Sequence, residues 1–390
     1  MMPKVLYSAF DLVPRPKGST THIRYFISAL TKAGYQLTLI TAGDPSLPTE
    51  EEWHGARLLR APALPDQNFL ARAESFGQFV TQQAQKETFD LYHVRAIWGG
   101  YPLVSQLDND VPLLYEVNGL PSIEMKYHYP QIRGTAVETK MREREYLTLQ
   151  AAAGIICPSA VTAHYLSSWG IDPNRITVIP NGVDIQKFAP PAKPATSHKE
   201  YPTAVYIGTL AEWQGLENLL RAWALVVADQ PAKLRLIGRG RKQQRKALLK
   251  LARKLDIADW ISLEPALPYE QIPALLTTAD LCLAPLSYND RNVTQGCCPL
   301  KILEYMACAR PIVASNLPVV RELLIEGQEA LLVEPDNPSA LATGILTLLN
   351  APDLGRILGQ RAANRASRDF TWRRAQMALL ATYDTLLDTV

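Results

Sequence analysis

The sequence has few cysteines, almost no net charge and no long apolar run, and each of these absences excludes a class of protein. Its 390 residues include 5 cysteines, an odd, sparse set that fits reduced cytosolic thiols better than a disulfide framework. A net charge of +2 argues against nucleic acid as a main partner. No apolar run approaches the roughly 18 residues of a transmembrane helix. The N-terminal MMPKVLYSAF lacks the charged and apolar regions of a signal peptide.

Absent motifs exclude several chemistries. There is no HExxH and no CxxC, and the adjacent Cys297 and Cys298 lack the spacing of metal ligands, so no metal site is expected. The sequence contains neither a GxxxxGK[ST] phosphate loop nor a GxSxG nucleophile elbow. No GxGxxG follows the first expected strand, which counts against a nicotinamide dehydrogenase.

What is present is the composition of a globular protein with alternating strands and helices. With 47% hydrophobic and 20% charged residues the composition argues against disorder, and the length predicts two or three domains. Lys4–Phe10 predicts a buried strand. The next helix has apolar residues at offsets 0, 3, 4 and 7 from Ile23, and Tyr35–Thr41 predicts a second strand. This β-α-β unit is typical of parallel sheets.

The same unit returns in the second half of the chain. Further strands are expected at Leu91–Val94, Leu113–Val117 and Gly154–Cys157, with a helix over Glu138–Ala153. After a Pro-rich segment, Ala204–Ile207 predicts a strand that is again followed by a glycine loop, a helix and a strand. The fold class is therefore α/β, with two Rossmann-like domains facing each other across a cleft. We expect domains at 1–187 and 203–370, a linker at 188–202, and a C-terminal helix at 371–390 that packs back on the first domain.

The most informative segment is the helix expected to start at Pro299 and run to about Ala309. Its N-terminus offers unpaired N–H groups and the positive end of the helix dipole, which attract phosphate. Lys301 in the first turn opposes that dipole, which suggests an anion for it to bind. Glu304 lies on the same face and could accept hydrogen bonds from ribose hydroxyls. The alternative is an i,i+3 salt bridge on a surface helix.

Two glycine segments lie at expected strand ends in the second half, Gly208–Gly215 and Gly238–Gly240. They allow close backbone approach to a ligand, or they are ordinary turns. In the first half, Gly18, Ser19 and His22 are candidates for the acceptor side, although an isolated histidine, like His93, is more often structural. Asn118 follows an expected strand, either at the cleft edge or in a simple Asn-Gly turn.

A basic run begins at Arg239 and ends at Lys254, with leucines interleaved among its eight cations. It predicts a solvated helix face over a domain core. The alternative is a surface for anionic lipid or a phosphorylated ligand.

The ordered set of motifs resembles family 4 glycosyltransferases. In chain order the matching segments are RITVIPNGVD (175–184), GTLAEWQGLENLLRA (208–222), LRLIGRG (234–240), ADLCLAPL (279–286), PLKILEYMACARPIVAS (299–315) and FTW (370–372). The resemblance implies a GT-B fold, with an acceptor-binding first domain and a nucleotide-sugar-binding second domain. It also implies metal-independent sugar transfer with retention at the anomeric carbon.

The donor implied is a UDP- or GDP-sugar, used as substrate with no further cofactor, and the acceptor is a hydroxyl of a glycan, a lipid-linked molecule or a small molecule. A cytoplasmic location is expected, with peripheral contact at the inner face of the membrane as an alternative. The alternative function is a non-catalytic sugar-nucleotide-binding protein of the same fold.

The sequence departs from the family at charged positions. Of the family's Glu-x7-Glu element, Glu304 matches the second Glu, whereas Gly296 occupies the first position within a PLK-type element. Thr209 and Gln214 replace the Arg and Lys that bind the diphosphate in many members. The implied donor-binding residues are Glu304, Gly208, Thr209, Gln214, Gly215, Gly238, Arg239, Gly296, Cys297, Cys298, Pro299 and Leu300.

Our hypothesis is that Lys301 and Arg291 replace the missing cations at the leaving diphosphate, because its stabilisation is usually the largest catalytic effect in such transfer. Arg239 and Arg241 are further candidates. Asn118 stands where many relatives carry a histidine, and it can bind a sugar hydroxyl but cannot take a proton.

Overall fold

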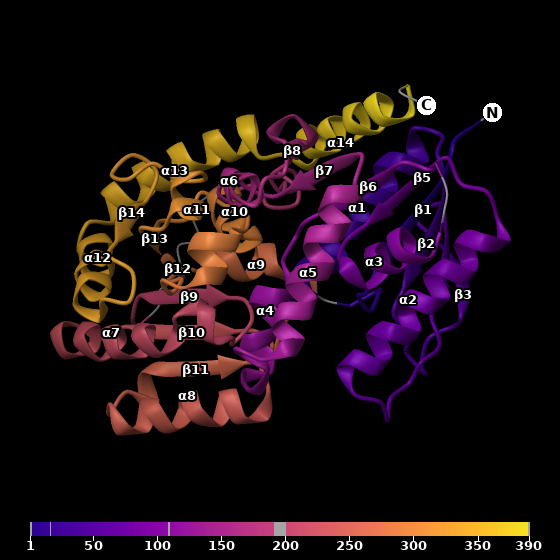
Figure 1. Cartoon of the computed structure of the whole chain (residues 1–390). Coiled ribbons are helices and arrows are strands. Elements are labelled where there is room, and N and C mark those ends of the chain that lie inside the picture. The colour runs from indigo at the N-terminus through magenta and orange to yellow at the C-terminus, as the bar shows by residue number, and fades with distance from the viewer. Residues whose placement is uncertain (1, 16, 108–109, 191–199, 389–390) are drawn as a thin grey trace. The chain divides into compact units, whose positions relative to one another are not determined.

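A computed structural model describes residues 2–15, 17–107, 110–190 and 200–388. These residues form two compact units (Figure 1). The first comprises Met1–Pro180, Gln295–Cys297 and Ala375–Val390, and the second comprises Asn181–Thr294 and Cys298–Arg374. The expected linker at 188–202 falls largely on residues 191–199, which lie outside the described residues.

The first unit alternates strands and helices. Its elements are β1 (Lys4–Ala9), α1 (Gly18–Lys32), β2 (Gln36–Thr41), β3 (Glu50–Trp53), β4 (Ala56–Arg60), α2 (Phe69–Lys86), β5 (Leu91–Val94), α3 (Ile97–Gln106), β6 (Leu113–Glu116), α4 (Pro121–His128), η1 (Pro130–Ile132), α5 (Ala136–Ala151), β7 (Gly154–Cys157), α6 (Ala160–Ser168), η2 (Pro173–Arg175) and β8 (Ile176–Val178). The strands β5 and β7 have the expected bounds, while α5 begins two residues before the expected Glu138.

Within the described residues, these strands form an eight-stranded sheet in the order β3-β4-β2-β1-β5-β6-β7-β8. All neighbours are parallel except β3 and β4. β1 pairs with β2 on one side and β5 on the other, so the strand order reverses at β1. In open α/β sheets, ligands bind beyond the carboxyl ends of the strands at such a switch point.

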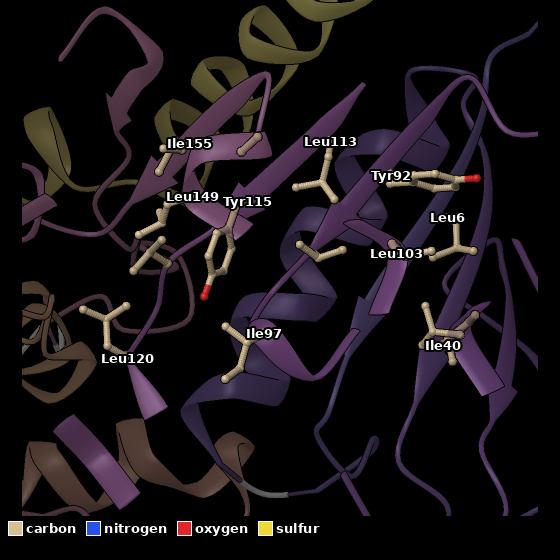
Figure 2. Close-up of a cluster of buried hydrophobic side chains, with 14 of the residues drawn as sticks. Leu6, Ile40, Tyr92, Ile97, Leu103, Leu113, Tyr115, Leu120, Leu149 and Ile155 are labelled. Atoms are coloured by element: carbon tan, nitrogen blue, oxygen red, sulfur yellow. The ribbon is translucent and has the colours of Figure 1, made fainter. Parts of the chain in front are cut away.

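The core of the first unit lies against this sheet. Figure 2 shows Leu6 of β1, Leu113 of β6 and Ile155 of β7 in one apolar cluster with Leu103 of α3. β1 is buried at every position after Lys4, as a strand covered on both faces should be. The apolar face predicted for α1 from Ile23 onward is confirmed, because its four residues are at most 1% exposed.

The second unit repeats the alternation. Its elements are β9 (Thr203–Ile207), η3 (Glu212–Gln214), α7 (Leu216–Asp229), β10 (Lys233–Ile237), α8 (Lys242–Lys254), η4 (Ala258–Trp260), β11 (Ile261–Glu264), η5 (Tyr269–Gln271), α9 (Ile272–Thr277), β12 (Leu281–Ala284), the π-helical η6 (Arg291–Gln295), α10 (Leu300–Ala307), β13 (Ile312–Ser315), α11 (Pro318–Arg321), β14 (Leu331–Val333), α12 (Pro338–Asn350) and α13 (Pro352–Asp369). The last residue of η6, Gln295, belongs to the first unit.

The described strands of this unit form a six-stranded parallel sheet in the order β11-β10-β9-β12-β13-β14. Its order reverses at β9, which pairs with β10 and with β12. The loops after β9 and β12 therefore meet at the switch point. α10 begins close to the expected residue, but its residues from Lys301 to Ala307 are all buried, so the helix is part of the core.

The C-terminal helix α14 (Trp372–Leu387) belongs to the first unit from Ala375 onward. As expected, it packs there: Tyr383 is fully buried, and a Cβ on Gly154 would lie 3.2 Å from the Leu386 side chain. The segment before the linker is held in the second unit, where Val183 bridges to Thr371 and donates to the carbonyl of Phe370. None of the helices formed by the described residues is long and apolar enough to span a bilayer.

Candidate functional site

The loop after β9, Gly208–Gly215, is shaped by its glycines. Gly215 has φ +70°, and a Cβ there would lie 1.8 Å from the carbonyl oxygen of Pro285, in the loop after β12. A Cβ on Gly238 would lie 1.5 Å from the carbonyl oxygen of Gly208. Three loops thus meet backbone to backbone at the carboxyl ends of β9, β10 and β12, which only glycine at these positions permits.

Lys301 reaches this loop from the first turn of α10. Its side chain is buried, its Nζ donates to Gln214 Oε1, and it lies 4.0 Å from the centroid of the Tyr206 ring. Tyr206 Oη in turn donates to the carbonyl of Thr209 at 2.6 Å. The structure therefore places the one cation of this turn among Thr209 and Gln214, the positions at which the family's Arg and Lys are missing.

Glu304 lies one helical turn beyond Lys301 and is 8% exposed. Burial raises the pKa of its carboxyl to about 8, and the charge of Lys301 offsets this only in part. Among the residues that the structure describes, none donates a hydrogen bond to this carboxyl. The surface salt bridge considered as an alternative is wrong, because both side chains are buried in the core face of the helix. A buried carboxyl without protein donors can accept hydroxyl groups of a ligand.

Two arginines flank the same loop. The Arg291 guanidinium stacks over Trp213, with Cζ 4.9 Å from the ring centroid, and so lies beside the residue that precedes Gln214. The carbonyl of Arg239 accepts from the N–H of Leu210 at 2.7 Å, while the Arg239 side chain is exposed. Arg241, at the start of α8, is exposed as well.

The segment before α10 is divided between the two units. Gly296 and Cys297 belong to the first, where a Cβ on Gly296, at φ +81°, would lie 2.6 Å from Ser159 Oγ. Cys298 belongs to the second, and its carbonyl accepts from Asn181 Nδ2 at 2.8 Å. Pro299 caps α10 and Leu300 is its first residue. That Gly296 and the two cysteines border a donor sugar stays a prediction.

At the switch point of the first unit, Glu116 at the end of β6 is the centre of a buried polar cluster. Its Oε2 accepts from Tyr7 of β1 at 2.6 Å and lies 3.0 Å from His93 Nε2 of β5. Its Oε1 accepts from Arg95 Nε at 2.9 Å and from Asn118, and lies 2.8 Å from His22 Nε2 of α1. Five groups from four parts of the fold thus converge on one carboxylate.

The charges of this cluster are compensated within it. Burial by itself would raise the pKa of Glu116, but Arg95 and the histidine donors hold it well below its usual range. Burial lowers the pKa of His93, so its ring is neutral at neutral pH. Glu116 is therefore ionised and a pure acceptor, and because a carboxylate has about four lone-pair sites it has none left for a substrate proton.

The predicted residues of the first half lie around this centre. Ser19 Oγ, in the first turn of α1 next to Gly18, donates to Asp11 at 3.0 Å, and Asp11 accepts from Arg95 at 3.2 Å. His22 and Asn118 line a small pocket with Glu116 and with five apolar or small residues: Phe26, Ile156, Cys157, Pro158 and Ile179. The interpretation of His22 and His93 as isolated residues is wrong, since both contact Glu116.

Sequence reasoning missed Glu116, Arg95, Tyr7 and Tyr383. One signal was available for Glu116: a charged residue inside a run predicted to be a buried strand needs partners. Nothing local indicated which partners these are, because they come from distant parts of the chain.

Residues Lys242–Lys254 of the basic run form α8, and five of the six cations on this helix are exposed: Lys242, Lys246, Lys250, Arg253 and Lys254. Arg245 differs from them. Its guanidinium donates to the carbonyls of Leu263 at 2.9 Å and Gly238 at 3.1 Å, at the ends of β11 and β10. Arg245 therefore ties α8 to the sheet and is not a member of a solvated face. No group of three or more His, Cys, Asp or Glu side chains among the described residues is arranged to hold a metal ion.

Comparisons with known proteins agree with this architecture. The model of Glycosyltransferase Family 4 matches residues 16–187, and that of Glycosyl transferases group 1 matches residues 201–351. The D-inositol 3-phosphate glycosyltransferase of Kineococcus radiotolerans is 25% identical, over 94% of this chain and 90% of its own length. The enzyme of the same name from Thermobispora bispora is 29% identical over 56% of this chain, which spans about half (52%) of that relative.

Solved structures show the same fold. A sucrose-phosphate synthase from Thermosynechococcus elongatus superposes with a TM-score of 0.86 at 21% identity, with 100% of both chains covered. An Anabaena protein solved in complex with UDP and glucose gives a TM-score of 0.77 at 18% identity, over 98% of this chain and 99% of that one. With two parallel-sheet α/β units and family matches over both, the chain belongs to glycosyltransferase family 4 and has the GT-B fold.

Proposed function

We propose that this protein transfers a sugar from a nucleotide-diphosphate-sugar to a hydroxyl acceptor, with retention at the anomeric carbon and without a metal ion. The observation that carries the proposal is the pair of buried ionisable side chains on α10. Glu304 has no donor among the described residues, and Lys301 is directed at a loop whose usual cations are missing. Both lie on one helix at the switch point where α/β sheets bind ligands.

In the proposed complex each group has a distinct task. Glu304 accepts the ribose hydroxyls, and Lys301 binds the diphosphate after giving up its bond to Gln214. Arg291, beside Trp213, adds a second cation. The glycines at 208, 215 and 238 hold the three loops together by backbone contacts, and in the proposed complex the backbone of the loop after β9 lies against the phosphates.

The proposed reaction breaks the bond from the anomeric carbon to the phosphate oxygen, whose electron pair stays with the diphosphate. A bond forms from the acceptor oxygen to the same face of that carbon, and the hydroxyl proton passes to the leaving phosphate oxygen. No side chain is assigned as nucleophile. His22 and Asn118 are proposed to orient the acceptor hydroxyl, because they face the pocket beside Glu116.

The first test is binding and turnover. Calorimetry with UDP, GDP and ADP identifies the nucleotide, and UDP comes first because the similar Anabaena structure holds UDP and glucose. Release of nucleotide from the matching sugar donors is then followed with and without an acceptor alcohol, and in the presence of EDTA. The product anomer is read by proton NMR coupling constants. Binding without any turnover would favour the non-catalytic alternative.

The cation assignment has its own variant. Lys301→Met keeps the buried chain length but removes the charge, and we expect turnover to fall about 100-fold or more, as when one donor to a developing oxyanion is removed. Lys250→Met, an exposed lysine on α8, is the matched control and should keep wild-type turnover. Wild-type turnover by Lys301→Met would refute the assignment of Lys301 as the cation that binds the leaving diphosphate.

A further inference from the structure

The C-terminal helix carries one polar side chain into the buried cluster of the first unit. Tyr383 of α14 is fully buried, and its Oη lies 2.7 Å from His93 Nδ1. The other ring nitrogen, Nε2, lies 3.0 Å from Glu116 Oε2. Tyr383 and His93 are 290 residues apart in the chain. The last helix therefore reaches Glu116 through a single imidazole.

The proton positions along this path follow from the charges. Glu116 is ionised and accepts only, so His93 Nε2 is the nitrogen that carries the proton. The His93 ring is neutral because burial lowers its pKa, so Nδ1 is an acceptor. Burial raises the pKa of Tyr383 well above its ordinary value, so its hydroxyl keeps its proton and donates to Nδ1. Only one tautomer of His93 satisfies both neighbours.

We propose that Tyr383 is a positioning residue of the acceptor-side pocket. By donating to Nδ1 it holds the His93 ring in the orientation from which Nε2 donates to Glu116, and Glu116 in turn orients two side chains of the pocket, His22 and Asn118. For its effect on turnover the proposal rests on the proposed function. Its effect on the histidine rings does not.

The positioning role of Tyr383 must be distinguished from a purely structural role, in which α14 only stabilises the first unit. The same helix is tied to the first unit by Tyr35 Oη, which donates to Asp384 at 3.1 Å, and by Gln376, which donates to the carbonyl of Tyr25 at 2.8 Å. Neither bond involves His93. Tyr35→Phe therefore removes one hydroxyl and one helix contact, as Tyr383→Phe does, but leaves the path to Glu116 intact.

Tyr383→Phe removes the hydroxyl that donates to His93 Nδ1. Without the hydroxyl, Nδ1 loses its donor, while the ionised Glu116 still keeps the proton on Nε2. The His93 ring then lacks the contact that fixes its orientation and can turn, so Glu116 loses part of the hydrogen bonding to Oε2. Tyr7 on Oε2 and Arg95 on Oε1 remain. We expect the fold to persist and the pocket side chains to shift.

The experiment labels the histidines with 15N in the full chain and records the ring signals of wild type, Tyr383→Phe and Tyr35→Phe. His93→Gln and His22→Gln spectra assign the two rings. We expect the Nε2–H tautomer of His93 in all three proteins, with a shifted Nδ1 signal of His93 and displaced His22 signals only in Tyr383→Phe. Unchanged His22 signals in Tyr383→Phe would overturn the proposal.

Activity gives the second readout. We expect kcat to fall about tenfold in Tyr383→Phe, as misplacement of a reacting group does, with KM for the nucleotide-sugar unchanged and Tyr35→Phe close to wild type. Equal kcat in the two variants would refute the role in positioning. If wild type itself transfers no sugar, the proposed function fails, and the His22 signals alone decide the present inference.

Discussion

Glu304 offers the sharpest test of the candidate donor site, because its buried carboxyl costs stability at neutral pH. Burial raises its pKa to about 8 from an ordinary value of 4.5, with Lys301 offsetting part of the effect. In the unfolded chain the carboxyl ionises above pH 4.5, while in the folded chain it stays protonated. The unfolded state is therefore favoured increasingly as pH rises from 4.5 to 8, and below 4.5 the effect vanishes.

Glu304→Gln removes this titration at almost unchanged shape. One pKa unit corresponds to about 1.36 kcal/mol, so linkage over the two pKa values gives a relative gain for the variant of about 3 kcal/mol from about pH 5 to about pH 7.5. For a domain of this size each kcal/mol shifts Tm by about 2–4 °C. The Tm difference between variant and wild type should therefore grow by about 6–12 °C over this range.

The assay is thermal unfolding of wild type and Glu304→Gln by circular dichroism across that pH range. Glu217→Gln on α7 is the control, since its carboxylate is exposed and hydrated in both states; it should follow the wild type at every pH. Parallel Tm profiles of wild type and Glu304→Gln would refute the buried, donor-free carboxyl. The same variant should bind the nucleotide more weakly, because ribose hydroxyls that donate to the carboxyl favour its ionised form on binding, and an amide cannot supply that charged acceptor.

Two further variants test how the second unit is built. Gly215→Ala meets the Pro285 carbonyl in addition to its unfavourable φ, whereas Gly327→Ala has nearly the same φ (+67°) and open space around it. Each should lose about 1–2 kcal/mol for the backbone conformation, and urea unfolding should show a clearly larger loss for Gly215→Ala; equal losses would contradict the backbone contact. Arg245→Ala should destabilise the unit by about 1–3 kcal/mol, because its carbonyl partners lose a charged donor. Lys250→Ala should change the free energy of unfolding by no more than about 0.5 kcal/mol. A similarly small effect of Arg245→Ala would contradict its role in tying α8 to the sheet.

Much of the fold could be predicted locally. The strands at Leu91–Val94 and Gly154–Cys157 have their expected bounds, because short apolar runs bounded by turn residues signal buried strands directly. The apolar stripe of α1 was predicted from the helical spacing of Ile23 and the apolar residues that follow it. The antiparallel pair β3–β4 was not expected, since its exposed glutamates give no apolar run.

The two sites differ in how much the sequence revealed. In the second unit, Lys301 and Glu304 are one helical turn apart and the loop at Gly208–Gly215 is continuous, so spacing and family resemblance were enough to group them. What the sequence left open was burial: a surface salt bridge and a ligand site have the same spacing. In the structure α10 lies in the core, so Lys301 and Glu304 are both buried.

By itself, the sequence determined the order of strands, loops and helices, and with it the family, because these depend on patterns a few residues long. Only the tertiary structure decided that Glu116 meets Tyr7, His93 and His22, and that Tyr383 closes the same network from the last helix. Such meetings depend on which strands are neighbours and on where a distant helix docks, which sequence periodicity does not encode. A carboxylate buried in a sheet must be paired, but which residues pair with it depends on the order of the strands in the sheet.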